Sequence, residues 1–279
     1  MTDTTWVVGV GYTGARLLEQ LPGSVGVSRS GDGGKVIRLD LDAGGVPAAD
    51  APGAIVYTVP PPRDSDSDRR LESLLSMLQP KPKRFVYLST TGVYGNRDGG
   101  RVDETTPVRP ESERAQRRVA AETALQTWSE DGDVEIVILR VPGIYGPGRL
   151  GLDRIRERAP VIDDAEANPG NRIHVDDLVR ACIAALDAAV PAGIYNLGDG
   201  DTRSSSWFTF EVARQAGLEP PPVVSLAEAE QTFSPMRLSF LCESRIVDVE
   251  RMRTVLKPAL AYADASDGIA ASLAEASTN

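Results

Sequence analysis

The sequence predicts an α/β fold in which a doubly wound parallel sheet is joined to a smaller C-terminal lobe. Short apolar runs alternate with amphipathic segments along the first 146 residues. Strands that alternate with helices in this way are typical of βαβ units, whose parallel sheet is covered on both faces. The first apolar run ends in a Gly-x-Gly-x-x-Gly segment formed by Gly9, Gly11 and Gly14, and a helical pattern follows at once. This order of strand, turn and helix start is typical of Rossmann folds.

Within this region the apolar runs predict strands, and the segments between them predict helices. Leu71, Leu74, Leu75 and Leu78 recur at i, i+3, i+4 and i+7, which is the spacing of a buried helical stripe. The first strand begins at Trp6. Further strands are predicted at 25–28, 35–39, 54–59, 84–89 and 134–141, and helices at 13–20, 66–79 and 111–130.

Beyond residue 146 the pattern is looser. It predicts helices at 175–188, 204–216 and 246–256 and a short strand at 193–197. We therefore expect a Rossmann domain built from residues 1–146, about 173–200 and about 246–260. Residues of about 147–172 and 201–245 are expected to form the substrate lobe, which folds over the carboxyl edge of the sheet.

The glycine segment predicts a site for the pyrophosphate of a dinucleotide cofactor. Gly9 allows the tight turn, Gly11 lets the backbone approach the phosphates, and Gly14 lets the helix pack close to the strand. Tyr12 and Thr13 lie at the helix start, where free N–H groups and the positive end of the helix dipole favour an anion. The alternative is a glycine-rich turn of the kind that any α/β protein can contain.

The residues after the second and third strands bear on the type of cofactor. Ser28, Arg29 and Ser30 stand where NAD-preferring folds usually place an acid for the ribose 2′-hydroxyl. An arginine flanked by hydroxyls suits a 2′-phosphate, so the sequence favours NADP over NAD. The alternative is an exposed loop arginine. Asp40 ends the third strand, where it either lines the adenine side of the cofactor or caps a turn.

The composition argues against several classes of function. A formal net charge of −10 disfavours nucleic acid or an anionic membrane as the main partner. One histidine and two distant cysteines predict no metal site and no disulfide framework. We expect Cys182 in the core and His174 as a helix cap or a buried hydrogen-bond partner. No apolar stretch is long enough to span a bilayer, so we expect a cytoplasmic protein that acts on a small molecule.

Four further segments occur in order along the chain. Residues 88–95 read Leu-Ser-Thr-Thr-Gly-Val-Tyr-Gly, and residues 140–148 read Arg-Val-Pro-Gly-Ile-Tyr-Gly-Pro-Gly. Residues 172–177 read Arg-Ile-His-Val-Asp-Asp, and residues 193–197 read Gly-Ile-Tyr-Asn-Leu. With the glycine segment, this ordered set resembles the extended or atypical short-chain dehydrogenase/reductases, specifically the NAD(P)-dependent epimerase/dehydratase group. The resemblance runs from residue 6 to about residue 260.

The resemblance implies roles for residues whose types alone indicate little. Thr90 falls where the family keeps its catalytic Ser or Thr, four residues before the Tyr of Tyr-Gly. The implied substrate is a nucleotide-linked sugar or a related polar carbonyl compound, and the implied state is a monomer or homodimer. Val59 and Pro60 would cross the cofactor ribose and pyrophosphate, and the residues flanking the nicotinamide would be Leu88, Ser89, Pro142, Gly143 and Ile144.

The chain departs from the family at the Tyr-x-x-x-Lys pair, where it has Arg114 and Arg118. A phenol of lowered pKa beside a lysine can move the proton that accompanies hydride transfer, whereas an arginine stays protonated at any working pH. Arg118 can still hold ribose hydroxyls, and Arg114 can clamp a carboxylate or phosphate. The proton would then pass through Glu113, Tyr94, Tyr145 or a water molecule.

Two hypotheses follow from this departure. The first is an NADP-dependent oxidoreductase, or an epimerase/dehydratase-like enzyme, with Thr90, Arg114 and Arg118 in a reorganised catalytic site. The second is a non-catalytic protein that binds NADP or senses redox state. The replacement of the Tyr and Lys favours the second hypothesis, and the ordered set of family segments favours the first.

Overall fold

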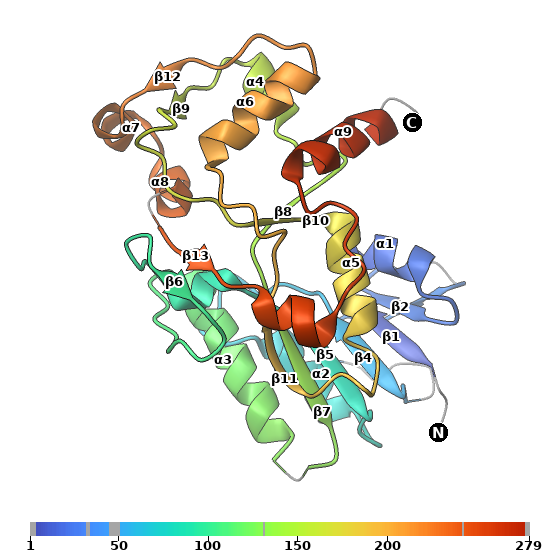
Figure 1. Ribbon diagram of the computed structural model, residues 1–279. Coiled ribbons are helices and arrows are strands. Elements are labelled where there is room, and N and C mark those ends of the chain that lie inside the picture. The colour runs from blue at the N-terminus through green and yellow to red at the C-terminus, as the bar shows by residue number, and fades with distance from the viewer. Residues whose placement is uncertain (1–3, 32–33, 45–50, 131, 242, 277–279) are drawn as a thin grey trace.

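The computed structural model describes residues 4–31, 34–44, 51–130, 132–241 and 243–276. At its centre is a seven-stranded sheet in the order β11-β7-β5-β4-β1-β2-β3 (Figure 1). Every neighbouring pair of these strands is parallel, and the predicted α/β fold with a parallel sheet is confirmed. The strands are β1 (Thr5–Val8), β2 (Val25–Ser28), β3 (Val36–Arg38), β4 (Ala54–Tyr57), β5 (Arg84–Thr90), β7 (Glu135–Val141) and β11 (Gly193–Asn196).

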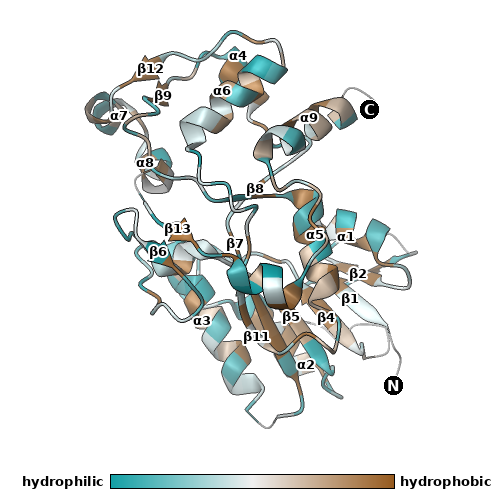
Figure 2. Ribbon diagram, viewed as in Figure 1, coloured by the Kyte–Doolittle hydropathy of each residue, from teal (hydrophilic) through white to brown (hydrophobic). Residues whose placement is uncertain are grey.

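Helices cover both faces of this sheet, which makes it doubly wound. One apolar core joins Leu17 and Leu178 to Val7 of β1, and the other joins Leu74 and Leu125 to Trp6. Successive side chains of a strand point to opposite faces, so β1 supplies both cores. Figure 2 shows the resulting apolar colouring of the central strands. The covering helices are α1 (Tyr12–Gln20) and α5 (Val175–Ala184) on the first face, and α2 (Arg69–Met77) and α3 (Glu113–Trp128) on the second.

The strand register brings the carboxyl ends of β1, β4, β5 and β7 to one edge. Val8 pairs with Tyr57, and Thr90 pairs with Val141. The segments that follow these strands therefore share one edge, which is where ligands of open α/β sheets bind. The sequence predicted this convergence.

The remaining elements lie mostly beyond that edge in Figure 1. Three short parallel pairs are β8 (Gly143–Tyr145) with β10 (Arg172–His174), β9 (Val161–Ile162) with β12 (Val223–Val224), and β6 (Arg101–Val102) with β13 (Ile246–Val247). The helices are α4 (Leu152–Arg156), α6 (Ser205–Gln215), α7 (Leu226–Thr232), α8 (Pro235–Leu241) and α9 (Ala265–Ala276), with a 3₁₀ turn, η1, at Thr91–Tyr94. The division into a Rossmann domain and a substrate lobe stays a prediction.

The predicted helix at 246–256 is wrong over its first part. Ile246 and Val247 form strand β13, and helical structure begins only at Glu250 and continues into the π-type turn η2 (Met252–Leu256). The Asn171 side chain explains the difference, because its amide donates to the Arg245 carbonyl at 2.8 Å and its oxygen accepts from the Val247 amide at 2.9 Å. Pairing with β6 and Asn171 thus holds this segment extended.

Helix α9 lies where the sequence analysis predicted no element. It packs its Ala265 and Ile269 against Val212 of α6 and against Tyr145. Gly268 permits this approach, because a Cβ at that position would lie 2.3 Å from the Tyr145 hydroxyl. Within the described part of the chain, no helix is long and apolar enough to cross a bilayer.

Candidate functional site

A cavity of about 620 Å³, which we term the first cavity, opens at the carboxyl ends of the central strands. Its wall contains the following residues that the sequence singled out: Gly9, Gly11, Tyr12, Thr13, Ser28, Arg29, Ser30, Val59, Pro60, Leu88, Ser89, Arg118 and Ile144. Its wall also contains Asp42, Arg70 and Arg149, which the sequence analysis did not find. Gly143 lines a neighbouring cavity.

The three glycines of the first loop occupy their positions for different physical reasons. Gly9 has φ +97°, a conformation that favours glycine. A Cβ on Gly14 would lie 1.9 Å from the Gly9 carbonyl oxygen, so close helix–strand packing requires glycine there. A Cβ on Gly11 would meet no protein atom within 4 Å, although Gly11 lines the first cavity. The protein's own contacts therefore do not explain Gly11, whereas a ligand approaching the backbone would.

The start of helix α1 also fits an anionic ligand. Its N-cap residue, Gly11, provides no side-chain hydrogen bond to the first turn. Helices α2 and α3, by contrast, are capped by the side chains of Asp68 and Ser112. The first N–H groups of a helix have no partner within the helix. At α1 these groups face the region where the sequence predicts the pyrophosphate.

A pair of opposite charges lies in the wall of the first cavity. Arg70 donates from Nε to Asp42 Oδ1 and from Nη2 to Asp42 Oδ2, both at 2.8 Å. This hydrogen bonding lowers the pKa of Asp42, and the charge of Arg29 lowers it further. Asp42 and Arg29 are therefore close enough to interact. Asp40 does not line the cavity, and its Oδ1 accepts from the Asp42 amide at 3.0 Å, as a turn cap does.

Arg118 reaches the first cavity from helix α3. Its Nη1 donates to the Leu88 carbonyl at 2.8 Å and to the Tyr87 hydroxyl at 3.0 Å. These bonds fix the guanidinium at the carboxyl end of β5. Arg114, one turn earlier, lies outside the wall of this cavity. Partial burial lowers the pKa of Arg114, and the charge of Glu243 opposes that shift.

The predicted hydroxyl residue Thr90 ends strand β5. Its Oγ1 accepts from the Gly92 amide at 3.1 Å and caps the turn η1. Because that contact uses an oxygen lone pair, the hydroxyl proton is still available to a ligand. Gly14, Thr90 and Pro142 border the site, but none of them lines the cavities described.

The residues considered as other proton carriers occupy different surroundings. Glu113 is exposed and pairs with Arg117 at 3.5 Å. Tyr94 is fully buried, donates to Asn196 Oδ1 at 2.7 Å, and accepts from Arg140 at 2.9 Å. Tyr145 lines a cavity, but burial raises its pKa. Glu113 lines none of the cavities described, and burial raises the pKa of both Tyr94 and Tyr145.

A buried ion pair lies behind the wall of the first cavity. Arg140 donates from Nη2 to Glu122 Oε2 at 2.7 Å, and both side chains are about 5% exposed or less. Ser89 donates to the other oxygen of Glu122 at 2.5 Å. Because burial of an ion pair requires full hydrogen bonding, this network holds Ser89 in a single position.

Two further cavities adjoin the first. The second cavity, of about 350 Å³, shares Ile144 and Arg149 with the first and is also lined by Thr91, Gly143, Tyr145, Arg172, Glu243 and Arg245, among others. The third cavity, of about 510 Å³, shares Ser205 and Leu241 with the second and is also lined by Arg154 and Arg237. The shared residues place the second cavity beside the first and the third cavity beside the second.

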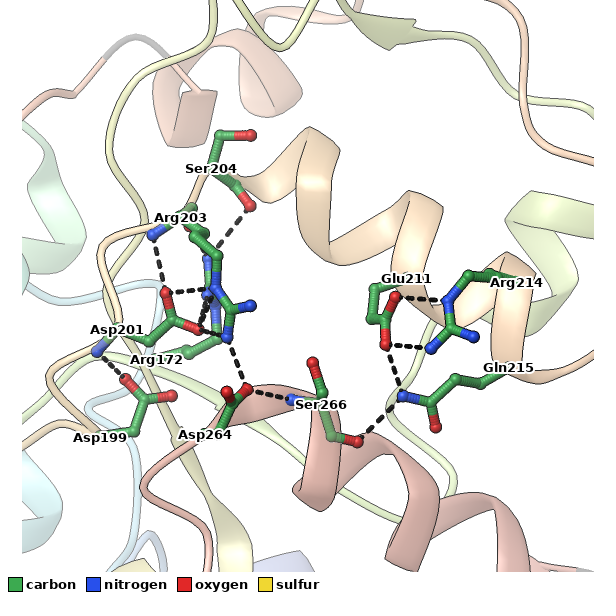
Figure 3. A network of polar contacts seen from close by, with 10 residues as sticks. All are labelled: Arg172, Asp199, Asp201, Arg203, Ser204, Glu211, Arg214, Gln215, Asp264 and Ser266. Carbon is green, nitrogen blue, oxygen red and sulfur yellow. Dashed lines mark hydrogen bonds and ion pairs between the residues drawn. The ribbon is translucent and has the colours of Figure 1, made fainter.

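Arg172 in the second cavity belongs to a network of charges (Figure 3). It pairs with Asp201 at 3.3 Å and donates to the Ser204 carbonyl at 3.1 Å, and Asp201 in turn pairs with Arg203. Burial raises the pKa of the neighbouring Asp199 to about 7. This network ties β10, the segment after β11 and the start of α6 together.

Two smaller sequence predictions are confirmed. His174 caps α5, since its Nδ1 accepts from the Asp176 amide at 3.2 Å, while its Nε2 contacts Ser272 Oγ at 3.1 Å. Cys182 is fully buried in the core. Among the described residues, no group of three or more His, Cys, Asp or Glu side chains is placed to hold a metal ion.

Comparison with known proteins agrees with this geometry. Residues 69–198 match the profile of the NAD dependent epimerase/dehydratase family. This segment, just under half of the chain, is similar to that family. A curated relative, Protein YeeZ of Escherichia coli K12, is 33% identical over 175 residues, which are 60% of this chain and 61% of YeeZ. The chain thus matches about three fifths of the length of that relative.

The solved structures show a likeness of fold over the whole chain. A functionally unknown conserved protein from Silicibacter pomeroyi DSS superimposes with a TM-score of 0.85 and 29% identity, covering 99% of both chains. MoeE5, solved in complex with UDP-glucose and NAD, superimposes with a TM-score of 0.77 and 22% identity, covering 99% of this chain and 100% of its own. The second likeness shows the fold alone.

Proposed function

We propose that this protein is an enzyme of the epimerase/dehydratase type that uses NADP and acts on a nucleotide-linked sugar or a related polar carbonyl compound. One observation carries the proposal: the first cavity, at the sheet edge, meets an uncapped helix start and a glycine that no internal contact requires. We infer a cytoplasmic protein that acts as a monomer or homodimer.

The residues of the first cavity fit a nicotinamide dinucleotide. The loop from Gly9 to Thr13 would hold the pyrophosphate through backbone amides. Arg29, between Ser28 and Ser30, would hold a 2′-phosphate, which supports NADP over NAD. The remaining contacts would come from Val59, Pro60, Leu88, Ser89, Pro142, Gly143 and Ile144. When bound, the cofactor supplies two-electron redox chemistry.

Arg118 and Thr90 would act on the substrate oxygen. The Arg118 guanidinium is fixed at the end of β5 and stabilises negative charge without giving up its proton. Thr90 keeps its hydroxyl proton available, because its oxygen already accepts from Gly92. We infer that the proton passes through Thr90 to water, since the Tyr94 hydroxyl is held by Asn196. Arg114 lines none of the cavities and would contribute only its positive charge beside the substrate.

The third cavity supports a substrate that contains a diphosphate. Arg154 and Arg237 line it, and no Asp or Glu is among its wall residues. Burial and the charge of Arg154 lower the pKa of Arg237 to about 10, which indicates that the charge of Arg237 is poorly compensated there. A diphosphate would compensate both arginines. MoeE5, which has the same fold, is in complex with UDP-glucose.

The proposal is tested by binding and turnover together. The purified protein is titrated with NADPH and then assayed with a panel of carbonyl compounds, including nucleotide sugars, by the loss of NADPH absorbance. We expect binding and turnover. Binding without turnover, with none gained in an Arg114→Tyr/Arg118→Lys double variant, would favour a non-catalytic NADP-binding protein instead.

A further inference from the structure

The second cavity carries positive charge although the chain as a whole is acidic. The formal net charge of the chain is −10. The charged residues in the wall of the second cavity are Arg149, Arg172 and Arg245, against one acid, Glu243. The negative net charge of the chain does not explain an excess of cations in this cavity, so we look for a ligand that would require it.

Arg245 is held rigidly in this wall. It donates from Nη1 to the Gly95 carbonyl at 2.7 Å, and from Nη1 and Nη2 to Glu243 Oε2 at 3.0 Å. Its side chain is 11% exposed. The Asn171 side chain fixes the backbone directly after this position, through the Arg245 carbonyl and the Val247 amide. Arg245 is therefore positioned in advance, which reduces the conformational entropy lost when a ligand binds.

Arg149 stands at the junction of the first and second cavities. Its guanidinium lies 3.9 Å from the centre of the Tyr12 ring, and the Tyr12 hydroxyl is fixed by the Pro147 carbonyl at 2.9 Å. Stacking uses the face of the guanidinium and leaves its N–H edge free to donate. In the part of the chain that the structure describes, no carboxylate lies within salt-bridge distance of Arg149.

Carboxylates compensate two of the three arginines and leave Arg149 as the uncompensated cation of the wall. Arg172 is committed to Asp201 and to the carbonyls before α6. Glu243 is committed to Arg245 and interacts with Arg114, which adds another cation beside the cavity. A neutral sugar would leave Arg149 without a counter-charge in a partly desolvated space, and it would leave unused the N–H groups of Arg245 that Gly95 and Glu243 do not accept from.

We propose that the substrate carries an anionic group, a carboxylate or a phosphate, on the part that enters the second cavity, and that Arg149 and Arg245 bind it. This inference rests on the proposed function, because it places the charged group beside the nicotinamide end of the first cavity. The substrate then carries negative charge at two places: the diphosphate in the third cavity and a second anionic group on the sugar in the second cavity. Its class is a nucleotide-linked sugar acid or sugar phosphate, and a neutral hexose is excluded.

Matched pairs of probes test the proposal on the full chain saturated with NADPH. The dissociation constants of UDP-glucuronic acid and UDP-glucose are measured by calorimetry, and those of glucose 6-phosphate and glucose by competition. We expect the charged member of at least one pair to bind about tenfold more tightly or better, because charge-assisted hydrogen bonds to arginine discriminate by that order. The pair that shows the preference identifies carboxylate or phosphate.

Substitutions then assign the preference to residues. Arg245→Gln and Arg149→Gln are each expected to reduce the ratio of the two dissociation constants to near one. Arg156→Gln serves as the matched control, because Arg156 is an exposed residue of α4 that pairs with Asp153 and lines none of the cavities described. This control is expected to keep the wild-type ratio.

If the wild-type protein bound the charged and the neutral member of both probe pairs equally, the proposal would be overturned. This comparison needs no variant, so the proposal stays testable even if Arg245→Gln does not fold. If Arg149→Gln weakened NADPH binding but kept the ratio of the two sugar dissociation constants, Arg149 would bind the cofactor and its assignment to the substrate would be overturned. Failure of NADPH itself to bind would instead overturn the proposed function, and that titration is read separately.

Discussion

The substitution Gly11→Ala separates cofactor binding from folding. Gly11 has φ −96°, which alanine adopts without strain, and its Cβ would meet no protein atom within 4 Å. Replacement of glycine by alanine at such a position stabilises a protein by about 0.4–1 kcal/mol, because the unfolded chain loses freedom. We therefore expect Gly11→Ala to fold with unchanged or slightly raised stability.

The same methyl group should weaken the cofactor complex. It would stand where the pyrophosphate approaches the backbone, and a hydrogen bond to a charged group is worth about 1.5–3 kcal/mol. Loss of one such bond corresponds to a decrease in NADPH affinity of about 10- to 150-fold. Stability is measured by urea denaturation followed by circular dichroism, and affinity by titration of NADPH fluorescence.

Gly14→Ala provides the contrast. Its Cβ would lie 1.9 Å from the Gly9 carbonyl oxygen, so α1 has to move away from β1. Overpacking of this kind costs about 1–3 kcal/mol or more, and the loss should be visible without ligand. If Gly11→Ala bound NADPH as the wild type does, the ligand would not approach this backbone and the reasoning would be refuted. If Gly11→Ala lost stability as Gly14→Ala does, the fold itself would require glycine at position 11.

Three further predictions concern the cofactor, pH and the core. Arg29→Ala should weaken NADP binding by about 1–3 kcal/mol and leave NAD nearly unchanged; equal losses in parallel titrations would contradict the assignment of Arg29. Burial raises the pKa of Asp199 to about 7. The folded protein then binds a proton that the unfolded chain releases near pH 4, so this group should lower the free energy of unfolding as pH rises from about 4 to 7. Asp199→Asn should flatten that slope in urea titrations at pH 5 and 8, and an unchanged slope would show that Asp199 is ionised in the fold. Glu122→Gln should cost about 3–5 kcal/mol, because it leaves Arg140 buried without its counter-charge; a loss below 1 kcal/mol by chemical denaturation would show that water reaches the pair.

The central sheet and the glycine loop were predictable because their signals are local. Apolar runs mark the buried strands, and Gly9, Gly11 and Gly14 stand at fixed spacing after the first one. Helix α9 was missed for an equally local reason. Gly268 lowers the helix propensity of that segment, yet the structure uses its missing side chain to bring α9 against Tyr145.

Contacts between distant segments account for the parts of the site that the sequence did not reveal. Arg70 lines the first cavity because it pairs with Asp42, and Arg149 does so because it stacks on Tyr12. Nothing near Arg70 in the sequence marks it as part of a site, and Arg149 was not singled out although it directly follows the segment 140–148. Arg118 was singled out only because its position resembles the family's lysine, and the structure does place it in the cavity wall.

Calorimetric titration of the purified protein with NADPH and with NADH tests the central claim most directly. Binding to one site, with NADPH the tighter ligand, is the result expected if backbone amides of the first loop hold the bridging phosphates. The absence of heat with either nucleotide, under conditions in which the protein is folded, would contradict the account.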